Sequence, residues 1–169
     1  TKYYGLYETG IFNIMKILIM GLPGSGKSTF AEPLAKSLFG IWINADQVRE
    51  KYDDWDFSDK GRIRQSQRMK HLSDGVVMAG GVAIADFICP TEETRREFDA
   101  DFIIWMATIG VGKYEDTNKI FIEPEYYDIR ISKWIDTNQL FKCLDGFNHG
   151  IKDTENFSRE LTQRLAKLQ

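Results

Sequence analysis

The sequence contains little that would support a disulfide scaffold, a zinc site or a membrane span. Its only two cysteines, Cys89 and Cys143, lie far apart and have no partners at metal-ligand spacing. No apolar run approaches the roughly 20 residues that cross a bilayer, and the run at residues 17–20 has the length of a buried strand. The first residues do not have the layout of a signal peptide. We therefore expect a cytoplasmic protein that does not bind membranes.

Excess positive charge is also absent. The 169 residues include 22 Lys and Arg against 25 Asp and Glu, so the formal net charge is −3. This balance excludes a broad basic surface for nucleic acid. Hydrophobic residues make up 43% and charged residues 28%, which is typical of a folded globular chain. The length suits one domain with its own hydrophobic core. Because the charge balance argues against nucleic acid, we expect the binding partner to be a small molecule.

Apolar segments of strand length alternate with segments of helical periodicity. The expected strands are 16–20, 41–43, 82–85, 102–106 and 129–131, and the expected helices are 27–39, 59–79, 91–98 and 153–168. This alternation predicts a three-layer α/β fold, in which helices cover both faces of a five-stranded parallel sheet.

Two segments do not follow this alternation. Residues 1–14 contain three tyrosines and two glycines without a clear period. We interpret them as a tail or upstream extension, with an N-terminal strand or arm as the alternative, so that 15–169 forms the single domain. Residues 109–125 have few aliphatic side chains and several charges, which predicts a loop or mobile lid.

A glycine-rich motif follows the first predicted strand. Residues 21–28, GLPGSGKS, fit the P-loop pattern G-x-x-x-x-G-K-[ST], and a predicted helix comes directly after them. In such a loop backbone N–H groups bind phosphate, the lysine reaches the β- and γ-phosphates of ATP, and the serine binds Mg²⁺. A glycine-rich turn without a ligand is the alternative. We expect Lys27 to face solvent until phosphate binds. The predicted nucleotide-binding residues are Gly21, Gly24, Ser25, Gly26, Lys27, Ser28 and Thr29.

Two carboxylates follow predicted strands. Asp86 ends the strand at 82–85, and Asp46 follows the strand at 41–43. The carboxyl ends of parallel strands face the ligand crevice of an open α/β sheet. Asp86 has the form of a carboxylate that holds Mg²⁺ together with Ser28. Asp46 is a candidate to orient or deprotonate an acceptor hydroxyl, or alternatively to cap a helix over 47–52.

Four arginines cluster between residues 49 and 68. A helix over 59–79 places Arg62 and Gln65 on one face and Arg64 and Arg68 on another. Charges on a helix usually lie on its solvated face, so spacing alone does not identify Arg49 and Arg62 as binding residues.

From residue 15 to about residue 131, the sequence resembles adenylylsulfate kinases, P-loop kinases that phosphorylate the 3′-hydroxyl of adenosine 5′-phosphosulfate. The family pattern is G-L-x-G-x-G-K-S-T, L-D-G-D-N-V-R, G-F-S-x-x-D-R-x-x-N and a strand ending in A-F-I-S-P. The matching segments are GLPGSGKST (21–29), INADQVR (43–49), DFSDKGRIRQ (56–65) and ADFICP (85–90). Their order and spacing agree with the family. The resemblance implies a P-loop kinase fold that uses ATP and Mg²⁺.

The resemblance also implies roles for individual residues. Asp46 falls on the family's second Asp, close to the acceptor hydroxyl. Arg49, Arg62 and Gln65 fall on the residues that hold the phosphosulfate. Arginine suits this group because its forked donors match clustered anionic oxygens. Phe57 falls on the aromatic residue that stacks on the substrate adenine, and Phe121 in the lid is a second such candidate.

Several positions depart from the family. Asn44 replaces its first Asp, and Asp86 stands where the family has a small or apolar residue. The lid segment R-D-x-K-G-L-Y is reduced to residues 112–114 without its Arg-Asp pair. Lys113 keeps one positive charge there, and we predict that it meets the transferring phosphoryl group.

We expect phosphoryl transfer from MgATP to adenosine 5′-phosphosulfate. The alternatives are another small-molecule or nucleotide P-loop kinase, and a nucleotide-binding regulatory module with little turnover. The resemblance also makes a homodimer possible.

Overall fold

The computed structural model describes residues 14–144, 163, 164 and 167 of the chain. Within this part, five strands form one sheet in the order β2-β3-β1-β4-β5, and every pair of neighbours is parallel. The strands are β1 (Met15–Met20), β2 (Ile41–Asn44), β3 (Val82–Asp86), β4 (Phe102–Met106) and β5 (Ile129–Ile131). All five predicted strands are confirmed, within one residue at each end.

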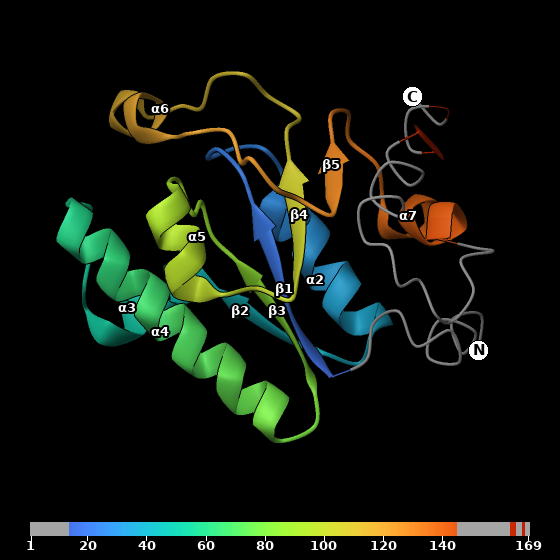
Figure 1. Ribbon diagram of the computed structural model, residues 1–169, viewed down its shortest axis with the longest axis horizontal. Coiled ribbons are helices and arrows are strands. Elements are labelled where there is room, and N and C mark those ends of the chain that lie inside the picture. Colours follow the sequence, from blue (N-terminus) through green and yellow to red (C-terminus); the bar gives the residue numbers. More distant parts are fainter. Residues whose placement is uncertain (1–13, 145–162, 165–166, 168–169) are drawn as a thin grey trace.

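Helices cover both faces of the sheet, as the alternating pattern predicts (Figure 1). The helices are α2 (Lys27–Ser37), α3 (Ala45–Tyr52), α4 (Asp59–Met78), α5 (Glu92–Phe98), α6 (Glu115–Ile120) and α7 (Thr137–Leu144). In the view of Figure 1, α3, α4 and α5 lie on one side of the sheet, and α2 and α7 lie on the other. The three-layer α/β fold is therefore confirmed.

The central strand β1 divides the core into two halves. Ile17 and Ile19 belong to the cluster that contains the apolar residues of α2 and α7. Leu18 and Met20 belong to the cluster formed with α3, α4 and α5. All four side chains are completely buried. Successive side chains of a strand point to opposite faces, so a continuous apolar run indicates a strand that is covered on both sides.

Two helices differ from the expectation. α6 lies within residues 109–125, where a loop or lid is predicted, and α7 has no predicted counterpart. α6 is too short to show an apolar period. Before α7, Asp136 and Gln139 each accept a hydrogen bond from the other's backbone N–H, at 2.8 and 2.9 Å. This D-x-x-Q pattern resembles a capping box and was a readable signal for the helix.

Two expectations fall largely or wholly on residues that the structure does not describe. The N-terminal tail at 1–14 lies outside them except for Ile14. The closing helix at 153–168 lies outside them except for residues 163, 164 and 167.

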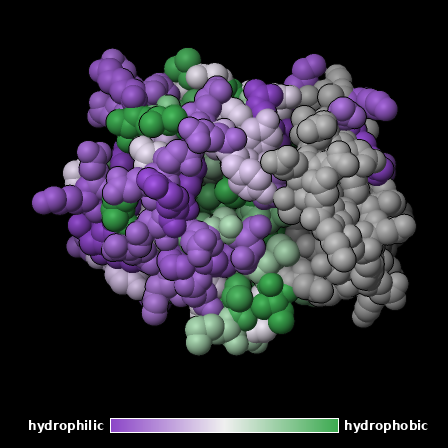
Figure 2. Space-filling view, in the orientation of Figure 1, coloured by the Kyte–Doolittle hydropathy of each residue, from purple (hydrophilic) through white to green (hydrophobic). Residues whose placement is uncertain are grey.

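The surface is polar over α3 and α4 on the face in Figure 2, and hydrophobic side chains gather at the lower edge, where α4 ends. Met78, the last residue of α4, is 88% exposed. Among the described residues, no helix combines the length and apolar character needed to cross a membrane.

Candidate active site

One cavity of about 860 Å³ opens at the carboxyl ends of β1, β2 and β3. It is bounded by the P-loop, the start of α3, the connection from α3 to α4, the loop after β3 and the segment around α6. Twelve predicted site residues line it: Gly24, Gly26, Lys27, Ser28, Thr29, Asp46, Arg49, Phe57, Arg62, Gln65, Asp86 and Lys113. The parallel topology brings these residues together, because every strand delivers its following loop to the same edge.

The P-loop backbone leaves donors free at the start of α2. Gly24 and Gly26 have φ values of +86° and +91°, a region that side chains rarely adopt. Gly26 is also the N-cap of α2 and supplies no side-chain cap. The first N–H groups of a helix have no partner within the helix. An anion at this helix end would satisfy them and would also meet the positive end of the helix dipole.

Lys27 does not face solvent, so that prediction is wrong. The residue is only 9% exposed, and its Nζ donates a hydrogen bond to the carbonyl oxygen of Leu22 at 2.9 Å. Burial lowers the pKa of the ammonium group, while the nearby Asp86 and Asp46 act in the opposite direction. The loop therefore curls around its own lysine and holds the charge at the cavity wall.

Ser28 and Asp86 lie side by side, as predicted for two residues that bind one cation. The Ser28 hydroxyl donates to Asp86 Oδ2 at 2.7 Å, and Asp86 is only 2% exposed. Within the described residues, no group of three or more His, Cys, Asp or Glu side chains could hold a metal ion. A hydroxyl and one carboxylate suit Mg²⁺, which commonly takes one or two carboxylates and completes its shell with water and substrate phosphate.

Asp46 lies in the first turn of α3 with its side chain exposed. The helix of the alternative interpretation, 47–52, exists as part of α3, but Asp46 is not its cap. Asn44 caps the helix instead, since its Oδ1 accepts hydrogen bonds from the N–H groups of Asp46 and Gln47, each at 3.1 Å. The Asp46 carboxylate is therefore not committed to capping.

Arg49 and Arg62 both approach the ring of Phe57 on the cavity wall. The guanidinium carbons lie 4.5 Å and 5.6 Å from the ring centroid. Arg49 donates to the carbonyl oxygens of Asp54 and Asp56, and Arg62 donates to that of Phe57. Neither guanidinium forms an ion pair with a carboxylate of the described residues. Burial lowers the pKa of both from the ordinary 12.5, yet arginine stays charged at neutral pH.

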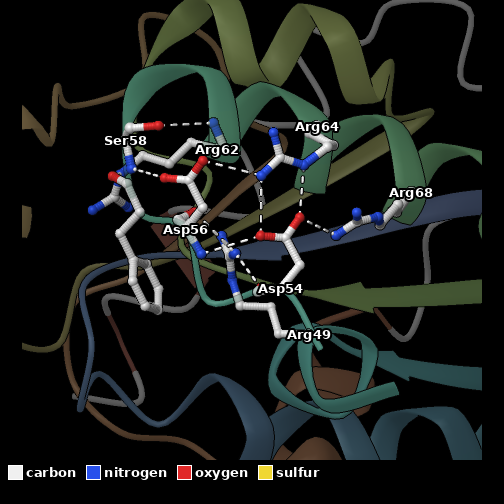
Figure 3. Close-up of polar contacts among 9 residues, drawn as sticks. Arg49, Asp54, Asp56, Ser58, Arg62, Arg64 and Arg68 are labelled. Atoms are coloured by element: carbon white, nitrogen blue, oxygen red, sulfur yellow. Dashed lines mark hydrogen bonds and ion pairs between the residues drawn. The ribbon is translucent and has the colours of Figure 1, made fainter. Parts of the chain in front are cut away.

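The other two arginines of the cluster form ion pairs with carboxylates (Figure 3). Arg64 contacts Asp54 at 2.6 Å and Asp56 at 3.0 Å, and Arg68 contacts Asp54 at 2.7 Å. These ion pairs tie the connection between α3 and α4 to the first turns of α4. They hold the two backbone carbonyls that receive Arg49, so they position that guanidinium indirectly.

This network makes stability depend on pH. Hydrogen bonds from Arg64, the Asp56 N–H and Arg68 hold the pKa of Asp54 well below its usual 3.8. A lowered pKa stabilises the fold above the unfolded-state value, and the contribution is lost as the pH falls through the folded-state value. We expect Asp54→Asn to lower the urea midpoint clearly at pH 7 and much less near pH 2, because the Asp54 carboxylate of the folded state stays ionised until the pH lies well below 3.8. Asp53→Asn, in the neighbouring left-handed cap of α3, is the matched control and should change little. An equal effect of Asp54→Asn at both pH values would contradict this account.

Gln65 and Lys113 lie in the cavity wall with different surroundings. Gln65 is 3% exposed and donates to the carbonyl oxygen of Ala45 at 3.0 Å, while its Oε1 is buried with no partner in the described residues. A buried unpaired oxygen is costly, which makes it a ready acceptor for a ligand donor. The Lys113 ammonium lies 5.0 Å from the ring centroid of Tyr114 and is exposed.

Phe121 does not belong to this cavity, so the structure does not support a stacking role there. It follows α6 and packs against the core on the α3–α4–α5 side, with Arg95 5.6 Å from its ring centroid. It lines a separate hollow of about 210 Å³ beside Trp105 and Arg130. Gly21 and Ser25 also lie outside the main cavity's lining.

Asn44, Trp55 and Tyr114 are among the lining residues that the sequence analysis did not assign to the site. Asn44 had a signal, because asparagine just before a helix is a favoured N-cap. No signal in the sequence pointed to the two aromatic residues, which the structure shows to be 51% and 55% exposed. Cys89 also lines the cavity, but burial raises the pKa of its thiol to about 12, so it stays protonated at neutral pH.

Comparison with known proteins gives one family model and several relatives. The model described as adenylylsulphate kinase matches residues 13–107, more than half of the chain. A probable adenylyl-sulfate kinase of Bacillus subtilis (strain 168) is 34% identical over 85 residues, covering 47% of this chain and 43% of that protein. A cytidylate kinase of Exiguobacterium sp. is 27% identical over 123 residues, covering 69% of this chain and 47% of that protein. The chain thus spans about half the length of these curated relatives.

A solved structure shares the fold. The Mycobacterium tuberculosis APS kinase in complex with AMPPNP and APS superimposes with a TM-score of 0.59 at 16% identity, over 89% of this chain and 96% of that one. The family model ends at Ala107, directly before the segment that contains α6.

Proposed function

The chain belongs to the adenylylsulphate kinase family, and from this premise we propose that it transfers the γ-phosphoryl group of ATP to the 3′-hydroxyl of adenosine 5′-phosphosulfate. One observation carries the choice of an anionic acceptor. Arg49 and Arg62 line the cavity, while within the described residues Asp54 and Asp56 form their ion pairs with Arg64 and Arg68 instead. Two guanidinium groups that form no ion pair within this part of the chain favour a ligand with clustered anionic oxygens.

The nucleotide side of the proposal rests on the P-loop. The free N–H groups at the start of α2 bind phosphate oxygens, and Lys27 exchanges the Leu22 carbonyl for the β- and γ-phosphates. Ser28 and Asp86 would hold Mg²⁺, which when bound neutralises charge on the transferring group. Lys113 supplies a further positive charge from the segment around α6.

The protein must mainly orient the acceptor, because phosphoryl transfer depends on positioning and on the stabilisation of charge. Asp46 lies on the cavity wall, and its carboxylate is not used as a helix cap. We assign it the role of orienting or deprotonating the acceptor hydroxyl. Phe57 offers the adenine ring a face, since it is 51% exposed even with Arg49 beside it. Homodimer formation stays a prediction.

Arg62→Ala is expected to weaken acceptor binding while leaving ATP binding nearly unchanged. A hydrogen bond to a charged group contributes about 1.5–3 kcal/mol, so the acceptor KM should rise roughly 10–150-fold. The measurement is ADP release with the acceptor varied at saturating ATP. Arg96→Ala removes an exposed arginine of α5 and is the matched control. An unchanged acceptor KM would exclude Arg62 from the acceptor site.

A panel of acceptors tests the whole proposal. The cytidylate kinase relative covers more of this chain than the adenylyl-sulfate kinase does, so nucleoside monophosphates are the second candidate class. ADP release is measured with adenosine 5′-phosphosulfate, cytidine and adenosine monophosphates, gluconate and shikimate. Turnover only with a nucleoside monophosphate would show that the acceptor is a nucleotide, while the assignment as a P-loop kinase would be kept. Nucleotide binding without turnover on any acceptor would favour the regulatory module.

A further inference from the structure

Asn44 lines the cavity at the carboxyl end of β2. It is the last residue of β2, and its Cα pairs in register with Asp86, the last residue of β3. The P-loop serine reaches the same point, since Ser28 contacts both residues. The hydroxyl of Ser28, the amide of Asn44 and the carboxylate of Asp86 therefore contact one another, although they come from three segments that are distant in sequence.

The Asn44 amide uses both of its ends. Its oxygen accepts from the N–H groups of Asp46 and Gln47, which begins α3. Its nitrogen donates to Asp86 Oδ2 at 3.0 Å and to Ser28 Oγ at 3.2 Å. An amide has two donor hydrogens and two acceptor lone pairs, so these four contacts account for its full capacity.

The contacts on Asp86 are concentrated on one oxygen. Oδ2 accepts from Ser28 at 2.7 Å, from Asn44 at 3.0 Å and from the Trp42 indole N–H at 3.3 Å. Within the described residues no donor is recorded on Oδ1. Three donors, one from α2 and two from β2, fix the carboxylate in one orientation and leave its second oxygen open for a cation or its water.

We propose that Asn44 is a positioning residue of the phosphoryl-transfer site, which aligns the Ser28–Asp86 pair and the first turn of α3 as one unit. This inference rests on the proposed function, because it concerns the metal-nucleotide end of that same site. An aspartate at position 44 would cap α3 equally well, since Asp and Asn are comparable N-caps. It would, however, donate nothing to Asp86 and would bring two carboxylates together.

Asn44→Ser separates capping from positioning. Serine also caps helices, but it lacks the amide donors and adds no charge. We measure ADP affinity by calorimetry with Mg²⁺ and with EDTA, and the urea midpoint of the ligand-free protein in EDTA. The expected result is a roughly 10–100-fold smaller gain in ADP affinity from Mg²⁺, with the affinity in EDTA unchanged. The kcat should fall while the acceptor KM is retained. A wild-type gain from Mg²⁺ would overturn the proposal and leave Asn44 as a cap.

A reciprocal exchange provides the second test. Asn44→Asp and Asp86→Asn are each expected to reduce the Mg²⁺-dependent gain, the first by setting two carboxylates against each other and the second by removing the charge. The double variant moves the carboxylate to β2 and the amide to β3 while keeping a donor–acceptor pair between them. It should recover the urea midpoint that Asn44→Asp loses, and part of the Mg²⁺-dependent gain. Purely additive losses would show that the two residues do not act together.

The calorimetric and unfolding measurements do not depend on the acceptor. If adenosine 5′-phosphosulfate is not phosphorylated but the calorimetric results hold, the proposed function fails and the role of Asn44 stands. If it is phosphorylated but Asn44→Ser retains the wild-type gain from Mg²⁺, the role of Asn44 fails alone.

Discussion

Lys27→Ala is expected to reduce phosphoryl transfer by at least roughly 10²–10³-fold, the usual cost of removing one donor that stabilises charge in a transition state. The ammonium is already held at the cavity wall by the Leu22 carbonyl. Phosphate oxygens that enter the P-loop meet a desolvated positive charge, and charge interactions are stronger where water is excluded. Steady-state ADP release with saturating acceptor measures the effect.

The burial of Lys27 requires a second variant, because alanine also removes a packed side-chain stem. Lys27→Met keeps most of that stem and removes only the charge, so it should lose as much activity with a smaller change in melting temperature. Lys36→Ala is the matched control, since Lys36 lies on the same helix, is exposed and pairs with Glu32 at 3.1 Å. Normal turnover in both Lys27 variants would contradict the kinase proposal outright.

Asp46→Asn is expected to lower kcat by roughly 10²–10⁴-fold, the contribution of a positioned acid or base. The structure makes this test clean, because Asn44 caps α3 and the Asp46 side chain is exposed. The substitution keeps the size of the side chain and removes one charge. The loss of a negative charge from the first turn of a helix costs only about 0.3–1 kcal/mol in stability.

Asp59→Asn makes the same chemical change in the first turn of α4, outside the cavity lining, and is the matched control. Both variants should unfold at nearly the temperature of the unsubstituted protein. If Asp46→Asn keeps full turnover, Asp46 does not act on the acceptor hydroxyl, and another group of the cavity must orient it.

The elements with strong local signals were predicted well. All five strands are short apolar runs, and the P-loop is defined by glycines at fixed spacing, so both are encoded by neighbouring residues. The helix predicted at 59–79 is α4 (Asp59–Met78), and that at 27–39 is α2 (Lys27–Ser37), which ends before Phe39 turns to φ 51°. α6 was missed because its six residues show no apolar period, and α7 was missed because the capping pattern at Asp136 and Gln139 was not used.

Lys27 and Phe121 show where single positions escaped prediction. A lysine in a glycine-rich loop is expected to be exposed, yet the loop folds back so that the Leu22 carbonyl oxygen accepts a hydrogen bond from the Lys27 ammonium group. Phe121 was assigned by its position in the lid, but the chain after α6 turns back, with Ile122 N–H donating to the Pro90 carbonyl at 2.8 Å. Both outcomes depend on the path of a loop, which residue types constrain weakly.

The sequence by itself determined that this chain is a three-layer P-loop protein with carboxylates at the ends of its strands, because buried runs and glycine spacing act locally. Only the tertiary structure decided which arginines serve the cavity. Asp54 and Asp56 form ion pairs with Arg64 and Arg68, whereas Arg49 and Arg62 form none with the carboxylates of the described residues. The register of β2 against β3 likewise brings Asn44 to Asp86, 42 residues away. Such pairings depend on distances across the fold, which no spacing along the chain encodes.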